Sequence, residues 1–173
     1  MKLLNVSLIA AAIACAAFAP AHAADNMDLD VTITIDKSCD VTSTGDVAFG
    51  NALASAGTVD AVGGLVTVQC TIGVPYDVAL NAGNNGGSDV GARQMLHTNG
   101  TDAIAYQLYS DAGRSQVWGN TVDTNTVEGT GTGFGGPAYN RTHPIFARAT
   151  IPGESPVGTY SDVNTTVAVI TSL

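Results

Sequence analysis

The alternation of apolar and polar residues at positions 27–35 is strict. Aspartate or threonine occupies one parity, and the other parity holds Met27, Leu29, Val31, Ile33 and Ile35. A β-strand places successive side chains on opposite faces, so this stretch is predicted to be a strand with one apolar and one polar face. The pattern alone leaves open whether the apolar face packs in the strand's own domain or elsewhere.

Further strand signals recur at short spacing, between turns rich in Gly, Asn, Asp and Pro. We expect strands at residues 41–49, 64–72, 76–80, 103–109, 115–118, 145–151 and 160–171. No fifteen-residue window carries a helical stripe, and the twenty glycines argue against long helices. The pattern therefore predicts an all-β fold, an antiparallel sandwich of short strands.

The expected strand at residues 160–171 differs from the others because residues 167–170 are apolar on both faces. Such a run is typical of a strand that lies between two neighbours. No further strand follows it in the sequence, so we expect one of its neighbours to come from elsewhere.

Residues 1–23 have the features of a secretory signal peptide. Lys2 precedes an apolar run at residues 3–14, and Ala21-His22-Ala23 fits a cleavage site. A lipoprotein signal ending at Cys15 is the alternative. We expect the mature chain to begin at Ala24, and no later segment is apolar for long enough to span a bilayer.

The charge of the chain argues against one class of partner, and its cysteines predict a disulfide. Fifteen acidic residues against six basic ones make nucleic acid a poor partner.

Once Cys15 leaves with the signal peptide, Cys39 and Cys70 have one possible pairing, and an oxidising compartment favours a disulfide. A metal site formed by two isolated thiols is the alternative.

Motifs that suggest chemistry are weak in this sequence. Residues 131–136 formally match G-x-G-x-x-G, but Pro137 follows where a nucleotide site needs a helix, so we expect a flexible surface loop. His97 and His143 are too few for a metal cluster and are expected on the surface or in loops. We predict no catalytic residue, no cofactor and no metal.

Aromatic residues offer a weak sign of sugar binding. Tyr106 and Trp118 lie in apolar strand runs and are expected in the core, whereas Phe134 and Tyr139 flank the glycine loop and are expected to be exposed.

Several pieces, in order, resemble a known family over nearly the whole mature chain. They are the alternating N-terminal stretch, SCDVTSTGDVAFG, GGLVTVQCTIGVPYDVALNAG, ARQM, IAYQLYSD, VWGN, a glycine-rich stretch and PVGTYSDVNTTVAVI. The chain resembles the spore coat protein U-like pilins, subunits of archaic (Csu-type) chaperone–usher pili, and most of all the major shaft pilin. It departs from the family in ending without an aromatic residue and in AYNRTHP at residues 138–144.

The resemblance implies an incomplete immunoglobulin-like antiparallel β-sandwich that lacks its last strand. A donor strand from another molecule completes it. By this resemblance, residues 24–36 are the donor segment and residues 37–173 the pilin domain. The donor side chains are the five alternating apolar residues, and the acceptor-groove strand contributes Val163, Val167 and Val169.

The resemblance also implies a function and partners. The chain would be a structural subunit, not an enzyme, secreted through the periplasm and assembled at the cell surface into a fibre for adhesion and biofilm formation. Its partners would be neighbouring pilin subunits, a periplasmic chaperone and an outer-membrane usher. The alternative is a self-contained secreted binding or coat protein whose first strand folds into its own sandwich.

Overall fold

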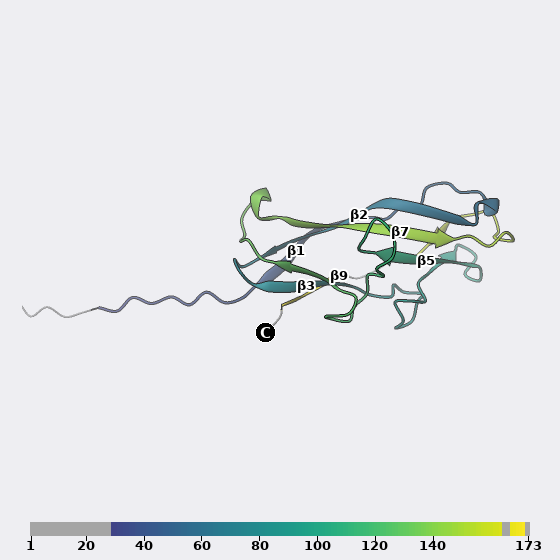
Figure 1. Cartoon of the computed structure of the whole chain (residues 1–173). Coiled ribbons are helices and arrows are strands. Elements are labelled where there is room, and N and C mark those ends of the chain that lie inside the picture. The colour runs from purple at the N-terminus through teal and green to yellow at the C-terminus, as the bar shows by residue number, and fades with distance from the viewer. Residues whose placement is uncertain (1–28, 164–166, 172–173) are drawn as a thin grey trace, which may run out of the picture. The chain divides into compact units, whose positions relative to one another are not determined.

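The computed structural model describes residues 29–163 and 167–171 (Figure 1). The chain divides into two units, Met1–Thr34 and Ile35–Leu173, which are described separately. In the first unit, residues 29–34 form no strand. The expected signal peptide and Met27 lie outside the described residues.

The second unit contains two antiparallel β-sheets. In the larger sheet the strand order is β1-β2-β7-β5-β4-β8. Its strands are β1 Cys39–Gly45, β2 Thr58–Cys70, β7 Arg141–Thr150, β5 Ala103–Tyr109, β4 Gln94–His97 and β8 Tyr160–Ser161. The smaller sheet has the order β6-β3-β9, formed by β6 Val127–Thr130, β3 Pro75–Leu80 and β9 Val167–Thr171. Two short 3-10 turns, η1 Ala54–Ala56 and η2 Pro137–Tyr139, lie in the connections.

The all-β antiparallel prediction is confirmed, and several strands lie where the pattern placed them. The expected strands at 64–72, 76–80, 103–109 and 145–151 correspond to β2, β3, β5 and β7. Strands β4 and β6 were not predicted, because each is short and lies between turns. The expected strand at 115–118 is reduced to a single bridge between Tyr109 and Val117.

The predicted strand at residues 160–171 is wrong in one respect, because the chain changes sheets within it. Tyr160 and Ser161 pair with β4 in the larger sheet, whereas β9 pairs with β3 in the smaller one. The expected strand at 41–49 also ends early, at Gly45.

The core lies between the two sheets. The β2 residues Val66, Val68 and Cys70 are buried, as predicted, but Thr67 and Gln69 on the opposite parity are buried as well. Tyr106 and Trp118 are also buried, as expected, and the indole Nε1–H of Trp118 donates to the Val78 carbonyl at 2.8 Å. Within the described residues, no helix is long and apolar enough to cross a membrane.

Candidate functional site

A groove of about 1200 Å³ opens between the two sheets of the second unit. Its floor is formed mainly by side chains of the larger sheet, and the smaller sheet contributes Leu80. The apolar floor residues are Val66, Leu80, Met95, Ile104, Tyr106, Leu108, Ile145, Ala149 and Ile151. An open cavity with such a lining is suited to bind apolar side chains, since a protein interior normally fills this space itself.

One rim of the groove is the segment that follows β1, residues 46–50. Its burial alternates as in a strand: Val47 and Phe49 are half-buried, and their neighbours in the sequence are exposed. The Phe49 ring lies edge-on to Tyr106 with the ring centroids 6.5 Å apart. The segment nevertheless pairs with no strand among the described residues. It therefore has the form of a sheet edge whose partner is absent from the described chain.

The opposite rim is formed by residues that follow β8. Asp162 is fixed there by hydrogen bonds from the Tyr106 hydroxyl at 2.8 Å and from the backbone N–H of Asn84 at 3.0 Å. Val163, which comes next, lines the groove and is exposed. The side chain of Asp162 thus anchors this rim to the floor.

The predicted acceptor-strand residues are only partly brought together. Val163 lines the groove, whereas Val169 in β9 is half-buried and packs against the core cluster. The backbone of Val167 pairs with Leu80, and the side chain of Val167 lies outside the described part of the chain. The role of these residues as acceptors stays a prediction.

The N-terminal arm, residues 24–36, presents its alternating apolar residues to solvent where it is described. Leu29, Val31 and Ile33 are 85%, 86% and 88% exposed. Ile35, the first residue of the second unit, is 77% exposed. Four exposed large apolar side chains at alternate positions are unusual, and exposed apolar groups of this kind often mark an interaction surface.

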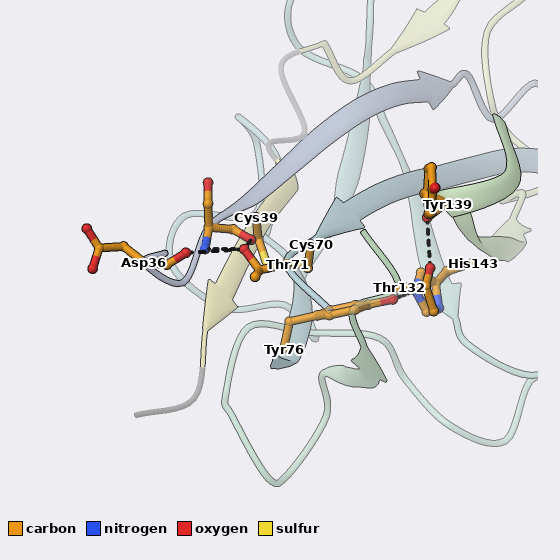
Figure 2. The surroundings of a disulfide bond; sticks show 9 residues. Asp36, Cys39, Cys70, Thr71, Tyr76, Thr132, Tyr139 and His143 are labelled. Carbon is orange, nitrogen blue, oxygen red and sulfur yellow. Dashed lines mark hydrogen bonds between the residues drawn. A yellow bond between two sulfur atoms is a disulfide. The ribbon is translucent and has the colours of Figure 1, made fainter. Parts of the chain in front are cut away.

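A disulfide between Cys39 and Cys70 lies where the arm joins the domain (Figure 2). Beside it, the Thr71 hydroxyl donates to the Asp36 carbonyl at 3.3 Å, and the Thr71 N–H donates to the Ser38 carbonyl at 2.9 Å. Residues 36–39 are therefore held firmly to the end of β2.

Arg93 is a structural residue that sequence reasoning missed. Its side chain is fully buried, and its guanidinium donates to the carbonyls of Leu80, Asn81 and Trp118 and to the Gln107 amide oxygen. Burial lowers the pKa of Arg93 to about 10, so it stays charged at neutral pH. The only sequence signal was its place in ARQM, because no pattern marks an arginine as buried.

The expectation that His143 lies on the surface or in a loop is wrong. His143 is in β7, half-buried, and its Nε2 lies 3.0 Å from the Tyr76 hydroxyl of β3 (Figure 2). This contact joins the two sheets, and desolvation lowers the pKa of the imidazole. His97 is also in a strand, β4, and its ring is 4.8 Å from that of Tyr160.

The glycine-rich segment at residues 131–136 is not simply a surface loop. Gly131 and Gly133 are buried, and the Gly133 N–H donates to the Cys70 carbonyl at 2.8 Å. A 3-10 turn at Pro137–Tyr139 follows, where a dinucleotide site requires an α-helix. Phe134 and Tyr139 are exposed, as predicted.

In the described part of the chain, no group of three or more His, Cys, Asp or Glu side chains is arranged to hold a metal ion.

Comparison with known proteins gives three similarities. A model of the Spore Coat Protein U domain matches residues 25–167. Protein U of Myxococcus xanthus is 34% identical over 181 residues, which cover 96% of both chains. A chain in the crystal structure of the CsuC–CsuE chaperone–tip adhesion subunit pre-assembly complex, from archaic chaperone–usher Csu pili of Acinetobacter baumannii, is similar with a TM-score of 0.48 and 18% identity. This last match covers 81% of the present chain and 41% of the other.

Proposed function

The chain belongs to the spore coat protein U domain family, and we propose that it is a structural subunit that polymerises into a surface fibre by donor-strand exchange. In this proposal the N-terminal arm of one copy fills the groove of a neighbouring copy. The observation that carries it is the coexistence, in one chain, of an open apolar groove and an exposed arm with alternating apolar residues.

The arm and the groove match in physical character. A strand has one apolar face when every second residue is apolar, and a groove between two sheets accepts one such face. Burial of each arm side chain gains about 1.5–3 kcal/mol. The unpaired edge at residues 46–50 supplies backbone groups for a ladder of hydrogen bonds, which stabilises the added strand further.

Register is essential to this function. A slip of one residue would place Asp30 and Asp36 in the groove in place of the apolar residues. Burial of an unpaired carboxylate is costly, so the alternation itself selects one register.

The open groove suggests which partners such a subunit would need. An apolar groove promotes aggregation as long as no strand fills it. We therefore propose that a periplasmic chaperone occupies the groove before assembly and that an outer-membrane usher exchanges it for the arm of the next subunit. Secretion under the signal peptide at residues 1–23 is part of the same proposal.

A second candidate is a self-contained secreted coat protein. It is favoured by the description of the matching family as the Spore Coat Protein U domain. In that case the arm would complete the sandwich of its own molecule, and no neighbour would be required.

The test is a pair of substitutions on opposite faces of the arm. Ile33→Asp places a carboxylate on the apolar face, and Thr32→Asp places the same carboxylate on the polar face one residue away. We expect Ile33→Asp to abolish surface fibres seen by electron microscopy and the heat-labile multimer ladder on unboiled gels, whereas Thr32→Asp leaves both intact.

The level of folded subunit separates the two candidates. For a fibre subunit, Ile33→Asp leaves the chaperone-bound subunit at its normal amount, because the substituted strand belongs to the neighbour's sandwich. A variant subunit that is degraded or unfolded before assembly would refute donor-strand exchange and support the coat protein.

A further inference from the structure

Two methionines lie in the two parts of the chain that the proposed function brings together. Beyond the expected signal peptide, the sequence contains only Met27 and Met95. Met27 is on the apolar parity of the N-terminal arm and lies outside the described residues. Met95 is in β4 and lines the groove. A thioether is an apolar group that oxidants convert into a polar one, so both parts of the proposed interface carry an oxidisable side chain.

The side chain of Met95 points into the space between the two sheets. In the antiparallel pair of β4 and β5, Met95 lies opposite Ile104. Residues directly opposite one another have their side chains on the same face of a sheet, and Ile104 is buried in the core cluster. Met95 also packs against this cluster but stays half-buried. Its thioether therefore belongs to the floor of the groove.

Met95 is incompletely covered because the two sheets differ in width. The larger sheet has six strands and the smaller one has three. Strand β4 is next to the edge strand β8 of the larger sheet, and among the described residues of the smaller sheet only Leu80 lines the groove. The chain's own residues thus leave part of the Met95 side chain accessible to small solutes through the open groove.

Oxidation of Met95 would make the floor of the groove polar. A peroxide such as hydrogen peroxide transfers one oxygen atom to the sulfur Sδ. The O–O bond breaks, an S–O bond forms, and the remaining oxygen takes up both hydrogens and leaves as water. The thioether is thereby oxidised to the sulfoxide, and the peroxide is reduced. Burial of a sulfoxide oxygen beneath an apolar strand that offers it no hydrogen-bond donor is costly.

On the basis of the proposed function, we propose that Met95 is a modification site, and that its oxidation to the sulfoxide prevents the groove from accepting the arm of a second copy. An arm seated in the groove covers Met95 and shields its sulfur from the oxidant. Oxidation therefore acts on subunits before assembly and spares those within a fibre. The block is reversible, because methionine sulfoxide reductases restore the thioether.

The first test compares the oxidation of Met95 in folded monomers and in multimers of the same chain. The two forms are separated by size-exclusion chromatography, treated with hydrogen peroxide for increasing times, and digested for mass spectrometry. We expect the Met95 sulfoxide to accumulate about tenfold faster in monomers than in multimers. Equal rates, fast or slow, would show that assembly does not change the cover of Met95 and would overturn the proposal.

The second test asks whether the sulfoxide blocks assembly. Met27→Leu leaves Met95 as the only methionine beyond residue 1, and the double variant Met27→Leu with Met95→Leu is its matched control. Monomers of both are treated with hydrogen peroxide, freed of oxidant and left to assemble. We expect the single variant to lose the heat-labile multimer ladder and to regain it after treatment with sulfoxide reductases for both epimers. The double variant should keep its ladder throughout; its loss there would place the sensitive group elsewhere and refute the proposal.

The unfolding midpoint of the oxidised monomer in urea separates an effect on docking from an effect on the fold. The sulfoxide stays in contact with water in the open groove, so we expect oxidation to leave the midpoint of the Met27→Leu variant unchanged. A marked fall would overturn the proposal. Normal assembly of a chain fully oxidised at Met95 would refute it as well and leave the fibre function standing, whereas a wild type that forms no multimers without oxidant would overturn both.

Discussion

The two flanks of the sandwich differ in how completely they are packed. On one flank Trp118, Tyr76 and Arg93 are almost fully buried, and each has hydrogen-bond partners. On the groove flank, Phe49, Met95, Ile151 and Tyr160 pack against the core but stay half-buried. We call these the closed flank and the open flank.

The contrast indicates which flank is completed by the chain's own residues and which flank a partner would complete under the proposed function. Buried polar groups on the closed flank have their hydrogen bonds within the chain, and no buried side-chain nitrogen or oxygen among the described residues lacks a partner. On the open flank the unfinished element is apolar surface together with one unpaired edge. Under the proposed function a neighbouring strand supplies both, so substitutions on the closed flank should lower stability and substitutions on the open flank should impair assembly.

The largest expected effect on the closed flank comes from Arg93→Met. The substitution removes the guanidinium that donates to the carbonyls of Leu80, Asn81 and Trp118. Loss of a buried hydrogen bond from a charged donor costs about 1.5–3 kcal/mol, so we expect the free energy of unfolding to fall by about 3–5 kcal/mol in urea titrations. Arg148→Met, which removes an exposed guanidinium paired with Asp60, is the control and should change the midpoint little. Equal effects of the two substitutions would contradict the assigned role of Arg93.

Loss of the disulfide should rank next. Cys39 and Cys70 are 31 positions apart, and on the chain-entropy model their bond is worth about 3–4 kcal/mol. The double variant Cys39→Ala with Cys70→Ala should lower the free energy of unfolding by about this amount. Reducing agent should lower the stability of the wild type and leave that of the double variant unchanged. A double variant as stable as the oxidised wild type would show that the closed flank does not depend on this bond.

A pair of glycine substitutions compares a packed and an open position within residues 131–136. A Cβ at Gly131 would clash with the Thr71 carbonyl oxygen and would lie 2.7 Å from the Cys70 Cβ, whereas a Cβ at Gly136 meets no described heavy atom within 4 Å. We expect Gly131→Ala to cost about 1–3 kcal/mol of stability and Gly136→Ala to cost little, by thermal unfolding. If both are neutral, the loop is not packed on the disulfide as described.

The smallest effect is a pH dependence that arises from His143. Desolvation lowers the pKa of His143 in the folded protein, so the unfolded chain binds the proton more readily. The stabilisation is fully present above the ordinary histidine pKa of about 6.5 and is lost as the pH falls through the lower folded-state pKa. The slope stays below about 1.4 kcal/mol per pH unit, the limit for one group. His143→Gln keeps a polar partner for Tyr76 and should reduce the change of the unfolding midpoint with pH between pH 7 and 5. An unchanged pH dependence would exclude His143 as its source.

Local pattern predicted much of the fold, although burial in β2 does not itself alternate, because Thr67 and Gln69 on the opposite parity are buried as well. The β2 residues Val66, Val68 and Cys70 face the core as their parity requires, and the Cys39–Cys70 disulfide followed from the count of cysteines. The groove could not be predicted from the alternation of residues or from the count of cysteines. It depends on the distance between two sheets, and only the resemblance to a family indicated it.

Other errors have physical causes of the same kind. The sheet change between β8 and β9 lies in the mostly polar residues 162–166, which the prediction included in a single strand. Arg93 and His143 are polar residues satisfied by partners far away in the sequence, and a local pattern assigns such residues to the surface.

The pairing of β9 with β3 also bears on how fast the domain folds. Tyr76 and Thr171 are neighbours in the smaller sheet, although most of the domain lies between them in the sequence. Contacts of such long range slow folding, because the chain must close a large loop before any interaction offsets its entropy. Until β9 docks, the edge of β3 with which it pairs stays accessible to other chains. The time for which the unfolded chain is vulnerable to aggregation and proteolysis is therefore set by its topology.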